Sequence, residues 1–127
     1  MSERTVYEYA VVRAVPRVER AEFINVGIAL FCRKQRYANL KFHIDELKLK
    51  ALYKDVDIDL IRAHLMSFER ICAGEKSAGK IAGLEQAERF RWLTANRSTI
   101  IQSSATHVGL CFSADETHQD LFEKLIL

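Results

Sequence analysis

The sequence predicts an α+β fold: an N-terminal antiparallel β-meander of about three strands, central helices, then short C-terminal strands and a terminal helix. Three observations support this prediction. Apolar residues alternate with a period of two before residue 45, they recur with helical spacing after residue 57, and a capping box begins a last amphipathic segment at Ser113. The 127 residues are expected to form a single domain, 1–127.

The strands of the meander are expected at Val6–Val15, Phe23–Cys32 and Tyr37–Ile44. The first is rich in Val and Tyr and stops at Pro16, the only proline. In the second, strict alternation predicts one apolar face made of Ile24, Val26, Ile28, Leu30 and Cys32. Its other face is also largely apolar, so we expect a central strand that is covered on both sides. The short link to the third strand predicts an antiparallel hairpin.

Two acidic residues are expected to cap the first helices. Asp45 starts a short helix that reaches Tyr53, and Asp57 starts a longer one that Gly74 ends. The apolar stripe of the longer helix consists of Ile61, Leu65, Phe68 and Cys72. The link from 74 to 83 is small and polar, which favours a connection rather than a regular element.

The C-terminal half contains a third helix at 84–95, short strands at 99–102 and 108–112, and the last helix after Ser113. Ser113 and Glu116 have the spacing of a capping box. The residues of the last helix that are expected to face the core are Leu121, Phe122, Leu125 and Ile126.

Composition excludes several classes of protein. No apolar run is long enough to cross a bilayer, and the N-terminus lacks the apolar core of a signal peptide, so we expect a cytoplasmic protein with no membrane association. Cys32, Cys72 and Cys111 are odd in number and form no C-x-x-C pair. They are therefore expected to be buried thiols rather than parts of a disulfide framework.

Charge is unevenly distributed although the net charge is only +2. The segment 33–54 carries seven basic residues against Asp45 and Glu46, and the segment 98–123 has acids but no Lys or Arg. The basic segment is either an ordinary solvated surface or a seat for an acidic partner. Nucleic-acid binding by this face is a third hypothesis for function, but no recognised motif supports it.

Three partial motifs do not predict a catalytic or metal site. The segment 74–80 matches a P-loop, but the next residue is Ile81 rather than Ser or Thr, and a helix precedes it. Asp55, Asp57 and Asp59 have calcium-loop spacing without the required Gly and Glu, so a helix start explains them better. His107 and Cys111 lie four residues apart, but the cysteine sits in an apolar run typical of an inert thiol. We therefore expect no catalytic residue, metal or cofactor.

The most distinctive polar residues lie between and within the first two strands. Arg13 is followed by a charged turn and then by Asn25 and Gly27, which interrupt an apolar strand. The charged residues of the turn are Arg17, Glu19, Arg20 and Glu22. Its arginines either bind a phosphate or carboxylate, oriented by the glutamates, or simply pair with those glutamates.

The stretch 17–27 resembles the signature of a bacterial family known as domain of unknown function 3037. Further blocks of the resemblance follow in order at 70–74, 89–93, 97–102 and 107–111. The chain departs from the family pattern at Asn96 and Ala105, where the family has Pro, and at Val108, where it has Thr. The resemblance covers nearly the whole chain and implies no established activity.

The resemblance implies a genetic context beside HipA-like kinases, a toxin class that phosphorylates proteins, and hence a partner or regulator in a toxin–antitoxin setting. It also groups Arg97, Ser98 and His107 with the polar turn. If these residues converge with Arg17 and Asn25, they form a cleft for a small anion.

Two hypotheses for function follow. The first is a non-catalytic protein-binding or regulatory module, with a HipA-like kinase as a candidate partner. The alternative is an enzyme or a phosphate-ligand-binding protein that uses the Arg/Glu/Asn/His cluster.

Overall fold

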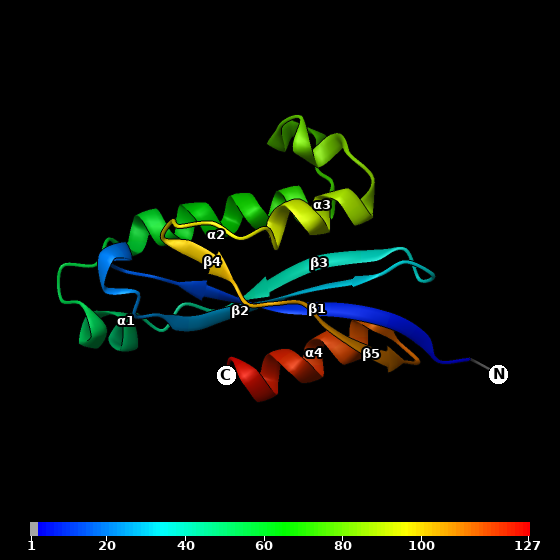
Figure 1. Cartoon of the computed structure of the whole chain (residues 1–127), viewed down its shortest axis with the longest axis horizontal. Helices are drawn as coiled ribbons and strands as arrows, with labels where there is room; N and C mark the ends of the chain where they lie inside the picture. Colours follow the sequence, from blue (N-terminus) through cyan, green and yellow to red (C-terminus); the bar gives the residue numbers. More distant parts are fainter. Residues whose placement is uncertain (1–2) are drawn as a thin grey trace.

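The computed structural model describes residues 3–127, which form one antiparallel sheet of five strands and four α-helices (Figure 1). The strands are β1 (Thr5–Ala14), β2 (Ile24–Cys32), β3 (Tyr37–Phe42), β4 (Ile101–Ser103) and β5 (His107–Cys111). The helices are α1 (Glu46–Leu52), α2 (Ile58–Ala73), α3 (Gln86–Leu93) and α4 (Ala114–Leu125), with short 3-10 turns η1 (Val18–Arg20), η2 (Lys76–Ala78) and η3 (Ile81–Gly83). The predicted α+β order of the elements is confirmed.

The C-terminal strands complete the sheet on the side of β1. The strand order is β3-β2-β1-β4, and β5 also pairs with β1. β4 pairs with the end of β1, where Ala14 faces Ile101, and β5 pairs with its beginning, where Thr5 faces Cys111. The two short strands therefore follow each other along one edge of β1.

Helices cover both faces of the sheet. α2 and α3 lie on one face and α4 lies on the other (Figure 1). The larger core, between the sheet and the α2/α3 layer, includes Leu40, Ile61 and Phe90. The smaller core lies under α4, where Leu30 and Cys32 pack with Ala114. β2 contributes to both cores, as expected for a central strand.

The two predicted faces of β2 are wrong at its N-terminal end, because a β-bulge changes the alternation. Val12 of β1 faces Gly27, but Arg13 faces Asn25, which leaves Val26 as an extra residue. The carbonyl of Val26 instead accepts a hydrogen bond from the His43 N–H (2.7 Å). As a result the α2/α3 side receives Ile24, Val26, Ala29 and Phe31, and the α4 side receives Leu30 and Cys32.

The predicted caps of α1, α2 and α4 are confirmed, whereas α3 is shorter than the predicted 84–95. The side chains of Asp45, Asp57 and Ser113 accept hydrogen bonds from the N–H groups of Lys48, Leu60 and Glu116. Gly74 ends α2 in the left-handed conformation, with φ of 79°. On α4, Leu121 packs on the core and Ile126 is buried, but Leu125 is exposed, which contradicts its predicted inward position.

None of the helices within residues 3–127 is both long and apolar enough to cross a membrane. All three cysteines are buried free thiols, as predicted.

Candidate functional site

The charged side chains of the turn after β1 form ion pairs with one another. The Arg17 guanidinium donates to Glu19 (2.9 Å) and to the hydroxyl of Tyr53 (3.3 Å), and Arg20 donates to Glu22 (2.5 Å). The hydrogen bond from Arg17 to Glu19, and to a smaller extent the one to Tyr53, raises the pKa of Arg17. The turn is exposed, so these pairs contribute little stability. Of the two sequence interpretations, the structure shows the pairing of arginines with glutamates.

The two residues that interrupt β2 have different explanations. Asn25 is exposed to solvent, so its interruption of the apolar strand places no amide in the core. Gly27 lies where β2 and β3 come very close, since a Cβ there would sit 2.6 Å from the Lys41 carbonyl oxygen. The glycine therefore marks the close approach of a neighbouring strand.

Arg13 is the arginine of this region that has no acidic partner. Its guanidinium lies 4.3 Å from the centroid of the Phe23 ring. Its Nε atom is buried and has no hydrogen-bond partner within the described chain. No carboxylate of residues 3–127 forms an ion pair with it.

The later family blocks do not bring their polar residues into one cleft. Arg97 packs over Phe68 and Trp92, in the α2/α3 layer, and donates to the Trp92 carbonyl. His107 stacks on Tyr9, which packs on the core under α4, on the opposite face of the sheet. Ser98 is exposed in the loop before β4. The predicted cleft of all eight residues is thus split by the sheet, and anion binding by any of its parts stays a prediction.

The partial motifs have structural explanations. The P-loop-like segment is the connection through η2 and η3, and at its start Arg89 packs on Gly74. Burial raises the pKa of the Cys111 thiol, which disfavours a nucleophilic thiolate, and its sulfur lies near Thr5 and Gln35. Between residues 3 and 127, no three metal-binding side chains cluster.

His118 is buried and forms two hydrogen bonds, and the sequence predicted neither partner. Its Nε2 lies 2.6 Å from the Ile28 carbonyl oxygen, and its Nδ1 lies 2.6 Å from the Tyr37 hydroxyl. A carbonyl only accepts, so Nε2 carries the proton and Nδ1 accepts from Tyr37. Burial lowers the pKa of His118 to about 4 and raises that of Tyr37 to about 12. The imidazole is therefore neutral at pH 7 and ties α4 to the sheet.

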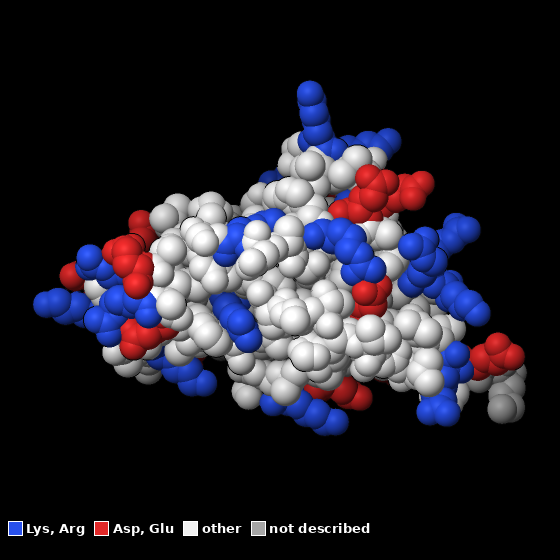
Figure 2. All heavy atoms as spheres, viewed as in Figure 1, with Lys and Arg blue, Asp and Glu red and all other residues white. Residues whose placement is uncertain are grey.

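An apolar surface remains uncovered at one corner of the sheet, beyond the end of α3. Val6 lies directly opposite Leu110, Val108 lies two residues before Leu110 on β5, and Phe112 follows directly after β5. These four residues are called the apolar corner below. All four are exposed: Val6 by 57%, Leu110 by 56%, Val108 by 69% and Phe112 by 62%. Figure 2 shows a largely uncharged surface over β1 and β5, next to basic side chains at the end of the β2–β3 hairpin. Adjoining apolar side chains exposed to this extent are typical of a docking surface.

A family profile matches the chain over residues 9–126. The chain belongs to the DUF3037 family, proteins of unknown function. No similar curated protein and no similar solved structure was found. Two of the DUF3037 blocks meet in space, because Arg89 donates to the carbonyls of Cys72 (3.2 Å) and Leu84 (2.5 Å) and so holds the end of α2. The two later DUF3037 blocks supply β4 and β5.

Sequence reasoning missed the apolar corner. The apolar run at 108–112 predicted a buried Cys111, which is confirmed, but it gave no prediction for the exposure of Val108, Leu110 and Phe112. A signal was present, since Val108, Leu110 and Phe112 alternate with His107, Gly109 and Cys111, which puts the large apolar side chains on the face opposite Cys111. Exposure of the corner follows from the position of β5 at the sheet edge, which the local pattern does not encode.

Proposed function

We propose that this DUF3037 protein is a protein-binding module that docks a partner on the apolar corner. The observation that supports this most directly is the exposure of the directly opposed pair Val6 and Leu110 together with Val108 and Phe112. A sheet normally buries such side chains under a helix or a second sheet. α3 stops short of this corner: its Arg91 reaches only Glu8 of β1 (2.8 Å). A partner that covers the corner completes the α2/α3 layer.

The family resemblance provides the first candidate partner, a HipA-like kinase. Co-expression with a HipA-like kinase from the same organism tests the proposal. Leu110→Asp is expected to weaken the complex by about a hundredfold, because it places a charge in the desolvated centre of the interface. The measurement is co-purification followed by titration of the labelled protein.

Leu47→Asp is the matched control, because Leu47 is 83% exposed on α1 and lies away from the corner. The free energy of unfolding of both variants is expected to lie within about 0.5 kcal/mol of the parent value, since both sites are on the surface. Equal loss of binding in the two variants, or no loss in either, contradicts the proposal. Self-association that disappears in Leu110→Asp shows instead that a second copy covers the corner.

Anion binding at Arg13 is a second candidate function, favoured by the buried Nε atom that has no partner. A phosphate or carboxylate oxygen would satisfy this donor. The neighbouring arginines of the turn are already paired with Glu19 and Glu22. Arg13 is therefore the better candidate than Arg17 or Arg20.

Titration with inorganic phosphate, followed by amide chemical shifts, tests the Arg13 site. Shifts are expected around Arg13 and Asn25, and Arg13→Gln is expected to abolish them. Arg17→Gln is the control and is expected to leave them unchanged. If the shifts follow Arg17 instead, the charged turn is the anion site.

A further inference from the structure

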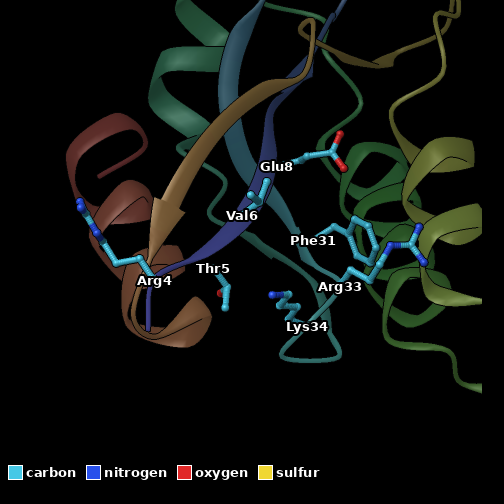
Figure 3. A pocket seen from close by; sticks show the side chains of 7 residues that line it. All are labelled: Arg4, Thr5, Val6, Glu8, Phe31, Arg33 and Lys34. Atoms are coloured by element: carbon cyan, nitrogen blue, oxygen red, sulfur yellow. The ribbon is translucent and has the colours of Figure 1, made fainter. Parts of the chain in front are cut away.

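Two hollows continue from the apolar corner across the same face of the sheet. The first, about 290 Å³, is lined by Arg4, Thr5, Val6, Glu8, Phe31, Arg33 and Lys34 (Figure 3). The second, about 570 Å³, shares Phe31 and Arg33 with it and reaches the start of α3 at Gln86. The shared residues make one groove, which runs from the corner to the space between the β2–β3 hairpin and α3.

The floor of the first hollow is apolar. Val6 belongs to both the hollow and the apolar corner. The ring of Phe31 stacks on Phe90 of α3 (5.6 Å between centroids), which fixes it in place. A concave surface of this size accepts one large apolar side chain, whereas a flat bilayer surface does not enter it.

The rim of the groove carries unpaired positive charge. Arg33, Lys34 and Arg36 all belong to the β2–β3 hairpin, and no ion pair joins them to a carboxylate in residues 3–127. The one carboxylate of the first hollow, Glu8, is already neutralised by Arg91. The Arg4 side chain extends away from the hollow (Figure 3), and its guanidinium lies 5.9 Å from the centroid of the Phe112 ring. The lining of the second hollow also contains Glu85, so the docking surface is bordered mainly, but not solely, by cations.

We propose that the groove binds an acidic amphipathic segment of the partner protein, with a large apolar side chain in the first hollow and carboxylates against the hairpin cations. This inference rests on the proposed function and specifies the chemistry of the partner. Charge complementarity of this kind sets orientation and association rate more than affinity. A nucleic acid fits less well, because the exposed apolar side chains of the corner are mostly aliphatic (Val6, Val108 and Leu110), whereas bases bind by stacking on aromatic rings.

Fluorescein-labelled synthetic peptides test the proposal directly. One has leucines at helical spacing and glutamates elsewhere, and its counterpart has lysines in place of the glutamates. The glutamate peptide is expected to bind, and to bind about tenfold more weakly to the double variant Arg33→Glu, Lys34→Glu. The lysine peptide is expected to prefer that charge-reversed variant. Lys48→Glu, Lys50→Glu is the matched control, because it reverses two exposed cations on α1.

Several results overturn the acidic assignment. These are equal binding of both peptides, no binding of the glutamate peptide, or an equal effect of the α1 control. The assignment is also overturned if the protein binds vesicles of phosphatidylserine and phosphatidylcholine, or a single-stranded oligonucleotide, more strongly than it binds the glutamate peptide. If the kinase complex is lost in Leu110→Asp but unchanged in Arg33→Glu, Lys34→Glu, the proposed function stands and only the groove assignment fails.

Discussion

Gly27→Ala is expected to lower the free energy of unfolding by on the order of 3 kcal/mol. The added Cβ would lie 2.6 Å from the Lys41 carbonyl oxygen and 3.1 Å from the Cβ of Phe42. Both contacts are with atoms on or next to the β3 backbone, so no side-chain rotation relieves them. The β2–β3 pair must separate locally, at the point where the bulge already interrupts the β1 pairing. Urea unfolding followed by circular dichroism measures the change.

Gly83→Ala is the matched control, because a Cβ there meets no atom within 4 Å. This variant is expected to be neutral or more stable by about 0.5 kcal/mol, through the lower entropy of its unfolded chain. A Gly27→Ala protein as stable as Gly83→Ala would show that β3 moves at little cost. In that case a ligand or partner, rather than the neighbouring strand, becomes the reason for glycine at position 27.

Acidification is expected to destabilise the protein through His118. The pKa of an unfolded histidine is near 6.5, and burial lowers the folded value to about 4. The unfolded state therefore binds the proton first as pH falls. The stability that neutral His118 contributes is fully present above about pH 6.5, declines below it, and is lost by about pH 4. The total is about 3 kcal/mol, from the difference between the two pKa values.

The pH dependence of unfolding separates His118 from other groups. In His118→Gln the amide can still donate to Ile28 and accept from Tyr37, but it does not titrate, so the loss between pH 6.5 and pH 4.5 is expected to shrink. His64→Gln, at an exposed histidine of α2, is expected to keep the full loss. Parallel curves for the parent and His118→Gln would show that His118 is not responsible. An imidazole resonance of His118 that titrates near pH 6.5 would lead to the same conclusion.

Local signals predicted the helices well. Asp45, Asp57, Ser113 and Gly74 act on the backbone within a few residues of themselves, so their caps were visible in the sequence. The alternation in β3 was also predicted, because only one of its faces is apolar. Elements whose signals are local are therefore predictable from one sequence.

Features that depend on distant partners were not predictable. The bulge at Val26 was hidden because β2 is apolar on both faces, so an extra residue leaves the composition of each face unchanged. His118 was assigned no role because its partner Tyr37 is 81 residues away in the sequence. Arg97 and His107 do not meet, because Arg97 lies in the loop before β4 and packs on Phe68 and Trp92, whereas His107 packs on Tyr9 on the α4 side of the sheet.

The pairing of β1 with both β4 and β5 has a consequence for folding. Thr5 pairs with Cys111 and Val12 pairs with Ser103. One edge of β1 therefore forms its hydrogen bonds only with residues that come much later in the sequence. Ordering so long an intervening chain before these contacts form costs entropy and slows folding. During synthesis the outer edge of β1 has no partner until residues beyond 100 are made, and an unpaired strand edge promotes aggregation. A chaperone, or an early partner, would have its longest opportunity to act on this edge.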